Sequence, residues 1–285
     1  MPSVDSSLAF ELGDSLFAAA IEATRSALGR AVLVGLCGSQ ASGKSTTAGR
    51  LAERLGRQGA RTIVFSIDDF YLTLRERQEL ARTVHPLLAT RGVPGTHDVA
   101  LMAGTIDALL RARPDAVTPL PRFDKASDDR VSRNAWTEFE GRPDIVILEG
   151  WCVGARPQDE AALLDPVNAL EAREDADGRW RLHANACLGS DYAAFFARLD
   201  LRLMLRAPSF ACVHSWRAEQ EAGLSRDARS ARPTMTDAEL ARFIAHYERL
   251  TRWILEDEPA DLIADIDERR APFAWRIGRS LPAAG

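Results

Sequence analysis

The chain has 285 residues, 46% of them hydrophobic, which is enough to bury the core of one large α/β domain. Its formal net charge of -5 argues against wholesale binding of nucleic acid or of an anionic membrane surface, so any basic site must be local. The four cysteines form no C-x-x-C pair, which favours free thiols over a disulfide framework or a zinc site. No stretch approaches the roughly 18–20 apolar residues of a membrane span, and the first residues lack the basic and apolar regions of a secretory signal. We therefore expect a cytoplasmic protein with no membrane or nucleic-acid partner.

Residues 8–28 have the pattern of an amphipathic helix. Leu12, Leu16, Phe17, Ile21 and Leu28 recur at helical spacing, and the glycine at position 29 is a plausible stop. We expect this apolar face to pack against a sheet. A helix that binds a partner protein is the alternative.

An apolar run at 32–37 leads into residues 38–46, which match G-x-x-x-x-G-K-S, the P-loop pattern. Gly38 and Gly43 allow a tight turn that exposes N–H groups to phosphate oxygens, and the N-terminus of the next helix adds partial positive charge. Lys44 can reach the β- and γ-phosphates, and the Ser45 hydroxyl can ligate Mg²⁺. A chance Gly/Ser turn is the alternative, but a strand before and a helix after count against it. The sequence predicts a nucleoside triphosphate site made by Gly38, Ser39, Ala41, Ser42, Gly43, Lys44, Ser45 and Thr46.

A second strand, expected over 61–67, runs directly into Asp68 and Asp69. The strand would deliver both carboxylates to the carboxyl edge of the sheet, where ligands bind in open α/β folds. A carboxylate near the γ-phosphate can accept the proton of a substrate hydroxyl, and Asp68 is the predicted base. Asp69 could help to organise Mg²⁺ through water. The alternative is a pair of turn-forming aspartates, one of which caps a helix.

Beyond Tyr71 the chain reads as a long polar connection punctuated by glycine and proline, as far as Asp98. Asp98 is well placed to cap a helix that begins at about Val99. His97 lies where a substrate hydroxyl or carboxylate could be recognised, although a structural loop histidine is the alternative.

A short strand is expected over 117–120, followed by a segment dense in charge. Here Arg122, Lys125 and Arg130 could contact an acidic substrate or the transferring phosphoryl group. The alternative is a solvated charged loop.

A buried-strand pattern over 144–148 ends in Glu149 and Gly150. Glu149 resembles a Walker-B carboxylate, which would hold a metal ion or a metal-bound water. A strand-end carboxylate paired with a nearby arginine is the alternative.

Residues 155–195 are acidic, contain prolines and show mixed periodicity, so we interpret them as an insertion or lid-like excursion. A strand follows over 199–205, and Pro208 opens a helix that is expected to run to about Gly223. Spacing in this helix could place Arg217 over the phosphates as a lid arginine. Trp216 is interpreted as a packing residue.

The last predicted elements are a helix behind the capping box at 236–239 and a final strand over 261–266. Strands that alternate with helices predict the α/β class: a P-loop NTPase fold with a doubly wound, mostly parallel sheet and helices on both faces. We expect one domain over residues 1–285.

Taken together, these motifs resemble the D-glycerate 3-kinase family of plants and fungi and its bacterial kinase-like relatives. That family lies within the P-loop group of phosphoribulokinase, uridine kinase and pantothenate kinase. The resemblance implies ATP and Mg²⁺ as cofactors and phosphorylation of a hydroxyl on a small metabolite, with D-glycerate favoured. The matching segments are 38–46, 66–73, 92–98, 121–125, 149–151, Trp216-Arg217 with Gln220, 235–247 and 265–269.

The resemblance also implies roles for individual residues. Asp68 corresponds to the aspartate that activates the acceptor hydroxyl, and residues 265–269 fall near the adenine. Together with the roles inferred above from the residues themselves, the expected catalytic residues are Lys44, Asp68 and Arg217, and the expected metal ligands are Ser45 and Glu149. The expected substrate-binding residues are Asp69, Tyr71, His97, Asp98, Arg122 and Lys125.

One difference from the family pattern leaves the identity of the acceptor substrate undecided. Residues 155–195 look longer and more acidic than a compact glycerate kinase requires. A kinase of the same fold that acts on pantothenate, a nucleoside or a sugar phosphate is the first alternative. A regulatory nucleotide-dependent ATPase is the second.

Overall fold

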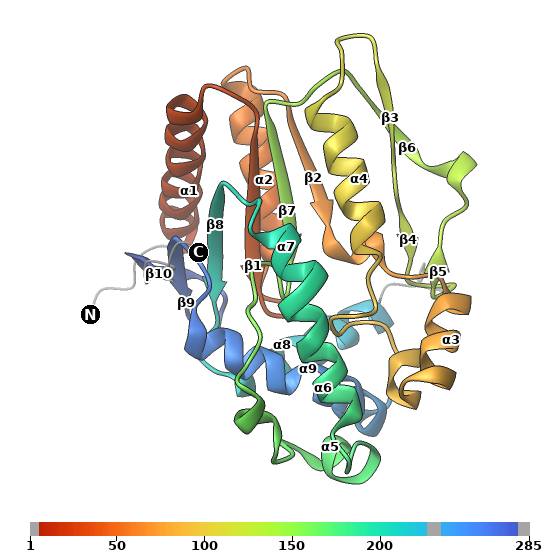
Figure 1. Cartoon of the computed structure of the whole chain (residues 1–285). Coiled ribbons are helices and arrows are strands. Elements are labelled where there is room, and N and C mark those ends of the chain that lie inside the picture. The colour runs from red at the N-terminus through yellow and green to blue at the C-terminus, as the bar shows by residue number, and fades with distance from the viewer. Residues whose placement is uncertain (1–5, 227–234, 279–285) are drawn as a thin grey trace.

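The computed structural model describes residues 6–226 and 235–278 (Figure 1). The predicted domain also includes residues 1–5, 227–234 and 279–285, which lie outside the described residues. Within the described part, the strands of the main sheet follow the order β10-β9-β8-β1-β7-β2. These strands are β1 (Val32–Gly38), β2 (Thr62–Ser66), β7 (Ile145–Gly150), β8 (Leu201–Arg206), β9 (Leu262–Ile266) and β10 (Pro272–Ile277).

The central strands are parallel and buried on both faces. β1 pairs in parallel with β7 and β8, and every residue of β1 and β7 is buried. β2 and β9 extend the parallel set, while β10 is antiparallel at one edge. Strands that are covered on both faces have continuous apolar sequences. This is why residues 32–37 and 144–148 could be recognised as buried strands. The predicted α/β class with a mostly parallel sheet is confirmed.

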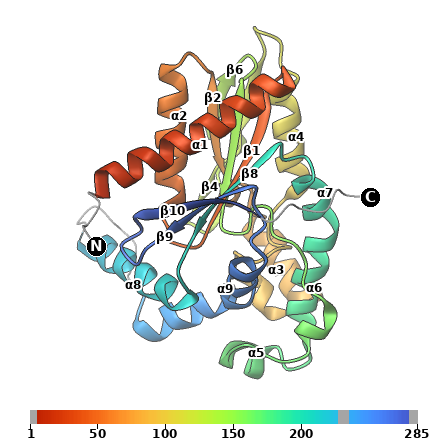
Figure 2. The same ribbon diagram turned by 90° about the vertical axis from the view of Figure 1, so that its left-hand side faces the viewer.

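Helices cover both faces of this sheet. One face packs against α1 (Ser6–Leu28), α2 (Lys44–Arg57) and α8 (Phe210–Arg226), and Figure 2 shows α1 running across it. The opposite face packs against α4 (Val99–Leu110), α7 (Ala193–Phe196) and α9 (Asp237–Asp257). The prediction for the first helix was wrong in part: Phe17 and Ile21 are buried, but Leu12 and Leu16 are 50% and 39% exposed.

The connection between β2 and α4 contains more structure than the polar pattern predicted. A 3₁₀ turn (Ile67–Phe70), the helix α3 (Leu74–Thr83) and a second 3₁₀ turn (Pro86–Ala89) fill it. α3 was missed because its sequence is almost wholly polar. A Thr73 capping box starts it, and Arg77, which is fully buried, anchors it to the carbonyls of Leu72 and Ala89.

Between α4 and β7 the chain forms small ladders outside the main sheet. β3 (Val117–Leu120) pairs with β6 (Thr137–Glu140), and β4 (Phe123–Asp124) pairs with β5 (Asp129–Arg130), all antiparallel. A 3₁₀ turn (Arg133–Ala135) lies between β5 and β6. Residues 122–125 therefore include the first strand of the β4–β5 hairpin, and the side chains of Arg122 and Lys125 are 59% and 55% exposed.

Residues 155–195, here called the excursion, are mostly helical. They contain a 3₁₀ turn (Glu160–Leu163), α5 (Ala169–Glu174), α6 (Arg179–Cys187) and a π-helical turn (Leu188–Tyr192) that leads into α7. Leu170 and Trp180 form an apolar cluster with Leu87 and Leu88. A buried ion pair, Glu171 with Arg249 of α9, joins the excursion to the rest of the molecule.

The last predicted strand, β9, is followed by a further strand that the sequence did not reveal. β10 lies at the sheet edge and exposes Phe273 and Ile277, at 66% and 84%, so its apolar residues do not follow a core pattern. The helix expected from Pro208 begins at Phe210, whereas the capping box at Thr236 is present as predicted. No helix of the described residues is long and apolar enough to cross a membrane.

Candidate active site

The P-loop connects the end of β1 to the start of α2. Gly43 caps α2 with φ of 90°, a conformation that favours glycine, and Ala41 also has positive φ. A Cβ on Gly38 would lie 2.7 Å from Ser42 Oγ, so a larger residue at this position would require the Ser42 side chain to move. The first N–H groups of α2 have no carbonyl partner within the helix, and they face the loop. This arrangement can bind phosphate oxygens.

A hydroxyl and a carboxylate meet beside the P-loop. Ser45 Oγ donates to Glu149 Oε1 at 2.6 Å, because β1 and β7 are neighbours with Leu36 opposite Glu149. Glu149 is 3% exposed, and its Oε2 is buried without a hydrogen-bond partner among the described residues. A hydroxyl and a carboxylate oxygen with spare capacity are ligands that suit Mg²⁺.

Both aspartates lie in the 3₁₀ turn at the carboxyl end of β2. Asp69 is held by the turn itself, since its carboxylate accepts from the Ser66 N–H at 3.3 Å. Burial raises the pKa of Asp69, and the nearby Arg122 guanidinium opposes this rise. The Asp68 carboxylate is not used by the turn in this way and is available for chemistry.

Asp68 is paired with a lysine from the β4–β5 hairpin. Lys125 Nζ donates to Asp68 Oδ2 at 2.6 Å. Burial acts to raise the pKa of Asp68, but the Lys125 ammonium outweighs it with help from Lys44 and lowers the pKa to about 2. The carboxylate is therefore ionised at neutral pH and able to accept a proton.

A cavity of about 930 Å³ brings most of the predicted site together. Its lining contains residues from the P-loop, both aspartates, the hairpin cations and α8. The predicted residues found there are Gly43, Lys44, Ser45, Thr46, Asp68, Asp69, Tyr71, Arg122, Lys125, Glu149 and Arg217, and Ala41 also lines it. Gly38, which ends β1, and Ser39 do not line this cavity, and Ser42 lines the smaller cavity described below.

His97 and Asp98 do not line the cavity. Asp98 caps α4 by accepting from the Leu101 N–H at 2.8 Å, and its other oxygen pairs with Arg130 at 3.1 Å. His97 is 4% exposed and stacks on Tyr71, with ring centroids 4.4 Å apart. The structure thus places His97 and Asp98 behind Tyr71, outside the cavity, where they contact Tyr71 and the adjacent Phe70.

Arg217 lies on the α8 side of the cavity. It is 8% exposed, donates to Gln220 Oε1 at 3.2 Å and lies over the Phe243 ring of α9. Trp216 is buried, as expected of a packing residue, and its Nε1 donates to the carbonyl of Glu268.

Several lining residues were missed by the sequence analysis, among them Gln40, Arg91, Trp151, Tyr247 and Arg270. Arg270 Nε donates to the Ala41 carbonyl at 2.8 Å and so ties the turn after β9 to the P-loop. Arg91 pairs with Asp128 and lies over the Phe123 ring. A signal existed for Arg270, since it follows a strand that ends at the ligand-binding edge.

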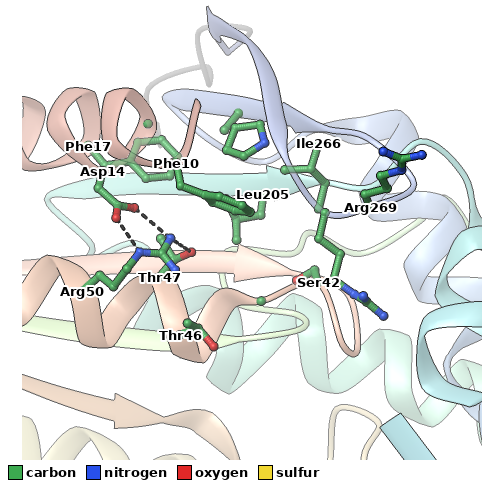
Figure 3. Close-up of a pocket in the computed structure, with 15 residues that line it drawn as sticks. Phe10, Asp14, Phe17, Ser42, Thr46, Thr47, Arg50, Leu205, Ile266 and Arg269 are labelled. Carbon is green, nitrogen blue, oxygen red and sulfur yellow. Dashed lines mark hydrogen bonds and ion pairs between the residues drawn. The ribbon is translucent and has the colours of Figure 1, made fainter. Parts of the chain in front are cut away.

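A second, smaller cavity of about 180 Å³ adjoins the first at Gly43, Thr46 and Arg270 (Figure 3). It is lined by residues of α1, α2, the end of β8 and the β9–β10 turn, including Phe10, Phe17, Leu205, Ile266 and Arg269. On its polar side Asp14 accepts from Arg50 at 2.5 and 3.0 Å. Apolar walls with one polar side suit a planar heterocycle.

A P-loop, an acidic pair after β2 and a strand-end glutamate on one cavity define a P-loop kinase, an ATP-dependent phosphotransferase with an alcohol group as acceptor. The comparisons agree. The chain is 34% identical to the uncharacterized kinase mug58 of Schizosaccharomyces pombe over 227 residues, covering 77% of this chain and 79% of that one. The chain belongs to the D-glycerate 3-kinase family and its kinase-like relatives, as the motifs predicted.

The chloroplastic D-glycerate 3-kinase of Arabidopsis thaliana is 27% identical over 260 residues, which are 85% of this chain and 54% of the plant protein. The chain thus spans about half the length of that relative. The solved structure of D-glycerate 3-kinase from Cryptococcus neoformans var. grubii has the same fold, with a TM-score of 0.75 at 24% identity, over 93% of this chain and 99% of that one. No family model matches the sequence.

Proposed function

We propose that the protein transfers the γ-phosphate of Mg·ATP to a hydroxyl of a small hydroxy acid, with D-glycerate as acceptor and 3-phosphoglycerate as product. One observation carries the proposal: an ionised carboxylate, Asp68, shares a cavity with the P-loop and with the cations Arg91, Arg122 and Lys125. The names of the plant and Cryptococcus relatives support the choice of acceptor.

The nucleotide phosphates would be bound by Lys44 and by the N–H groups of the P-loop and of α2. Ser45 and Glu149 would hold Mg²⁺, which supplies charge neutralisation for the transferring phosphoryl group when it is bound. Arg217, on the α8 side of the cavity, would act as the lid arginine.

The base of the nucleotide would lie in the second cavity. With the γ-phosphate on the side of Asp68 and Glu149, the rest of the nucleotide must extend past Gly43 and Thr46, which border both cavities. Ile266 and Arg269, from the segment that the resemblance implies to be near the adenine, line this second cavity, which supports the proposed position of the base.

The acceptor would bind beside Asp68, which accepts the proton of its hydroxyl as the new P–O bond forms. Lys125 donates to Asp68 Oδ2, so an acceptor hydroxyl that reaches this oxygen must compete with the ammonium. A carboxylate on the acceptor offers Lys125 a replacement partner. Arg122 and Arg91 add positive charge beside this position, and each also pairs with an aspartate, Asp69 and Asp128 respectively.

Other acceptors on the same fold, such as pantothenate or a sugar phosphate, are the first alternative. A regulatory ATPase is the second, and it predicts slow hydrolysis that small hydroxy acids do not stimulate. We propose a cytoplasmic enzyme that needs neither a nucleic-acid nor a membrane partner, in line with the acidic charge balance.

The test is ADP release from Mg·ATP with D-glycerate, L-glycerate, pantothenate, uridine, ribulose 5-phosphate or no acceptor. Strong stimulation by D-glycerate with 3-phosphoglycerate as product supports the proposal. Stimulation by another compound alone keeps the kinase and rejects D-glycerate. ATP binding without any stimulation rejects the proposed acceptor class.

A further inference from the structure

One residue of the excursion, Tyr192, forms hydrogen bonds with the segment that contains His97. Its hydroxyl accepts from the Gly95 N–H at 3.1 Å and lies 2.7 Å from His97 Nδ1. Tyr192 and His97 are 1% and 4% exposed, so solvent does not compete for these groups. Both contacts join segments about a hundred residues apart in the sequence.

The direction of the Tyr192–His97 hydrogen bond follows from counting buried polar groups. If Tyr192 donates to Nδ1, its oxygen also accepts from Gly95, and only the His97 Nε2–H is left without a partner in the described residues. If Nδ1–H donated instead, both the Tyr192 proton and the Nε2 lone pair would be buried and unpaired. Each unpaired buried group costs about 1–3 kcal/mol. The first arrangement is therefore favoured, and it places the His97 proton on Nε2.

His97 is mechanically coupled to the catalytic turn. Its backbone forms a bridge with Tyr71, and its ring stacks on that of Tyr71. The Asp98 N–H donates to the Phe70 carbonyl at 2.7 Å, which adds a second tie to the turn that carries Asp68. The charged side chain whose field acts on His97 is Asp68. A change in the tautomer of His97 reverses the polarity of each ring nitrogen and so alters the field at Asp68.

The segment that carries Tyr192 has an unusual backbone. Leu188–Tyr192 forms a π-helical turn between α6 and α7, and Tyr192 also packs edge-on against Phe196. π-turns inside helices are rare and often occur at functional sites. Here the extra residue per turn sets the position of Tyr192 relative to the helix that follows.

We propose that Tyr192 is a positioning residue of the phosphotransfer site: it holds His97 in the Nε2–H tautomer, and His97 in turn supports Tyr71 and the turn of Asp68. The excursion thereby contributes to catalysis without contacting ATP or acceptor. The catalytic part of this inference rests on the proposed function, whereas the tautomer does not.

The first test is ¹⁵N NMR of the histidine rings in the full chain, at neutral pH and without ligands. We expect His97 to be neutral with its proton on Nε2. Tyr192→Phe keeps the ring and removes the hydroxyl, so it should release His97 into a mixture of tautomers. A wild-type His97 with the proton on Nδ1, or an unchanged tautomer in Tyr192→Phe, overturns the proposal.

The second test is kinetic and uses whichever acceptor supports turnover. Tyr192→Phe should lower kcat about tenfold, less than the loss of a group that itself transfers the proton, and leave the KM for ATP unchanged. If Tyr192 acts through His97, the double variant Tyr192→Phe/His97→Ala should be no slower than His97→Ala alone. Additive losses, or an unchanged kcat in Tyr192→Phe, contradict a positioning role.

Ser190→Ala is the matched control. It removes another hydroxyl from the same π-turn, and that hydroxyl bonds only to carbonyls of α6 in the described residues. The His97 tautomer and kcat should both stay at wild-type values. If no acceptor in the panel supports turnover, the proposed function fails, but the NMR result still decides between the two tautomers.

Discussion

Lys125 Nζ donates to Asp68 Oδ2 at 2.6 Å, which places an ammonium against the carboxylate at the end of β2. The lysine comes from the β4–β5 hairpin, 57 residues further along the chain. This contact keeps Asp68 ionised and uses one of its two carboxylate oxygens. Under the proposed function, an acceptor that carries its own negative charge could exchange partners with Lys125, which would link proton acceptance by Asp68 to recognition of an acid.

Replacement of Asp68 by asparagine tests its role as base. Asn is nearly isosteric but cannot accept the proton, so kcat should fall by roughly 10²–10⁴ while the Kd for ATP changes little. Turnover and ATP binding by calorimetry give the two readouts. Asp115→Asn, at an exposed site before β3, is the control and should retain full activity. Wild-type turnover in Asp68→Asn would falsify the assignment.

Removal of the Lys125 charge should shift the pH dependence. In Lys125→Met, burial of Asp68 is opposed only by more distant charges, so its pKa rises from about 2. Because the base must be ionised, the acidic limb of the pH profile of kcat/KM moves to higher pH. Lys125→Arg keeps the charge and should leave the limb near its wild-type position. A limb that moves equally in both variants would mean that the ammonium does not control Asp68.

Glu149→Gln tests the metal site. The amide keeps the size of the side chain but loses the negative charge, and its hydrogen bond with Ser45 Oγ can be retained. We expect the Mg²⁺ concentration for half-maximal activity to rise about 10–100-fold, with the unfolding free energy little changed. Glu138→Gln, on the exposed side of β6, is the control. An unchanged Mg²⁺ requirement in Glu149→Gln argues against a metal role.

The parts of the site that the sequence predicted lie in short continuous segments. Residues 38–46, Asp68 and Glu149 each follow a buried strand, and the carboxyl ends of parallel strands meet at one sheet edge. Their meeting in one cavity therefore follows from topology. The hairpin cations Arg122 and Lys125 were predicted from local charge alone, but their pairing with Asp69 and Asp68 required the structure.

The sequence could not reveal contacts between distant segments. Tyr192 and Arg270 were missed because Tyr192 lies 95 positions from its partner His97 and Arg270 lies 229 positions from Ala41, so no local pattern could join them. α3 was missed because a capping box and a buried arginine, rather than an apolar stripe, fix it in place. For α1 the sequence predicted too much burial rather than too little structure. Its leucines Leu12 and Leu16 are exposed, and helical spacing alone does not say which part of an apolar face is covered.

The buried His97 should make the protein acid-sensitive. Burial lowers the pKa of His97 to about 4, with Asp68 opposing, whereas an unfolded chain protonates its histidines near 6.5. Between these values the unfolded state binds the additional proton, so the unfolding free energy falls as pH drops from 6.5 to 4. The loss from this group is on the order of 3 kcal/mol.

Urea unfolding of the wild type and of His97→Gln at several pH values measures that loss. His97→Gln should have a lower unfolding free energy than the wild type at pH 7. On acidification, its unfolding free energy should fall by a smaller amount. His183 and His246 also have lowered pKa values and are present in both proteins, so the difference in slope isolates His97. Parallel curves for the two proteins would show that His97 does not titrate in this range.

The Glu171–Arg249 pair should be the main attachment of the excursion to α9. Arg249 donates to both carboxylate oxygens at 2.8 and 2.6 Å and to the carbonyls of Ala162 and Asp165, and both side chains are buried. Glu171→Ala leaves a buried guanidinium without a counter-charge, which costs about 3–5 kcal/mol. Glu174→Ala on the same helix breaks the exposed pair with Arg242 and should cost about 1 kcal/mol or less.

Hydrogen exchange separates local from global loss in these two variants. If the pair fixes the excursion, Glu171→Ala should remove protection from α5 and α6 while the amides of β1 and β7 remain protected, because the central strands are buried independently of this contact. Tyr192 then loses its fixed position, and the tautomer of His97 should respond in the same variant. Uniform loss of protection across the sheet and the excursion would instead show that the two unfold as one cooperative unit.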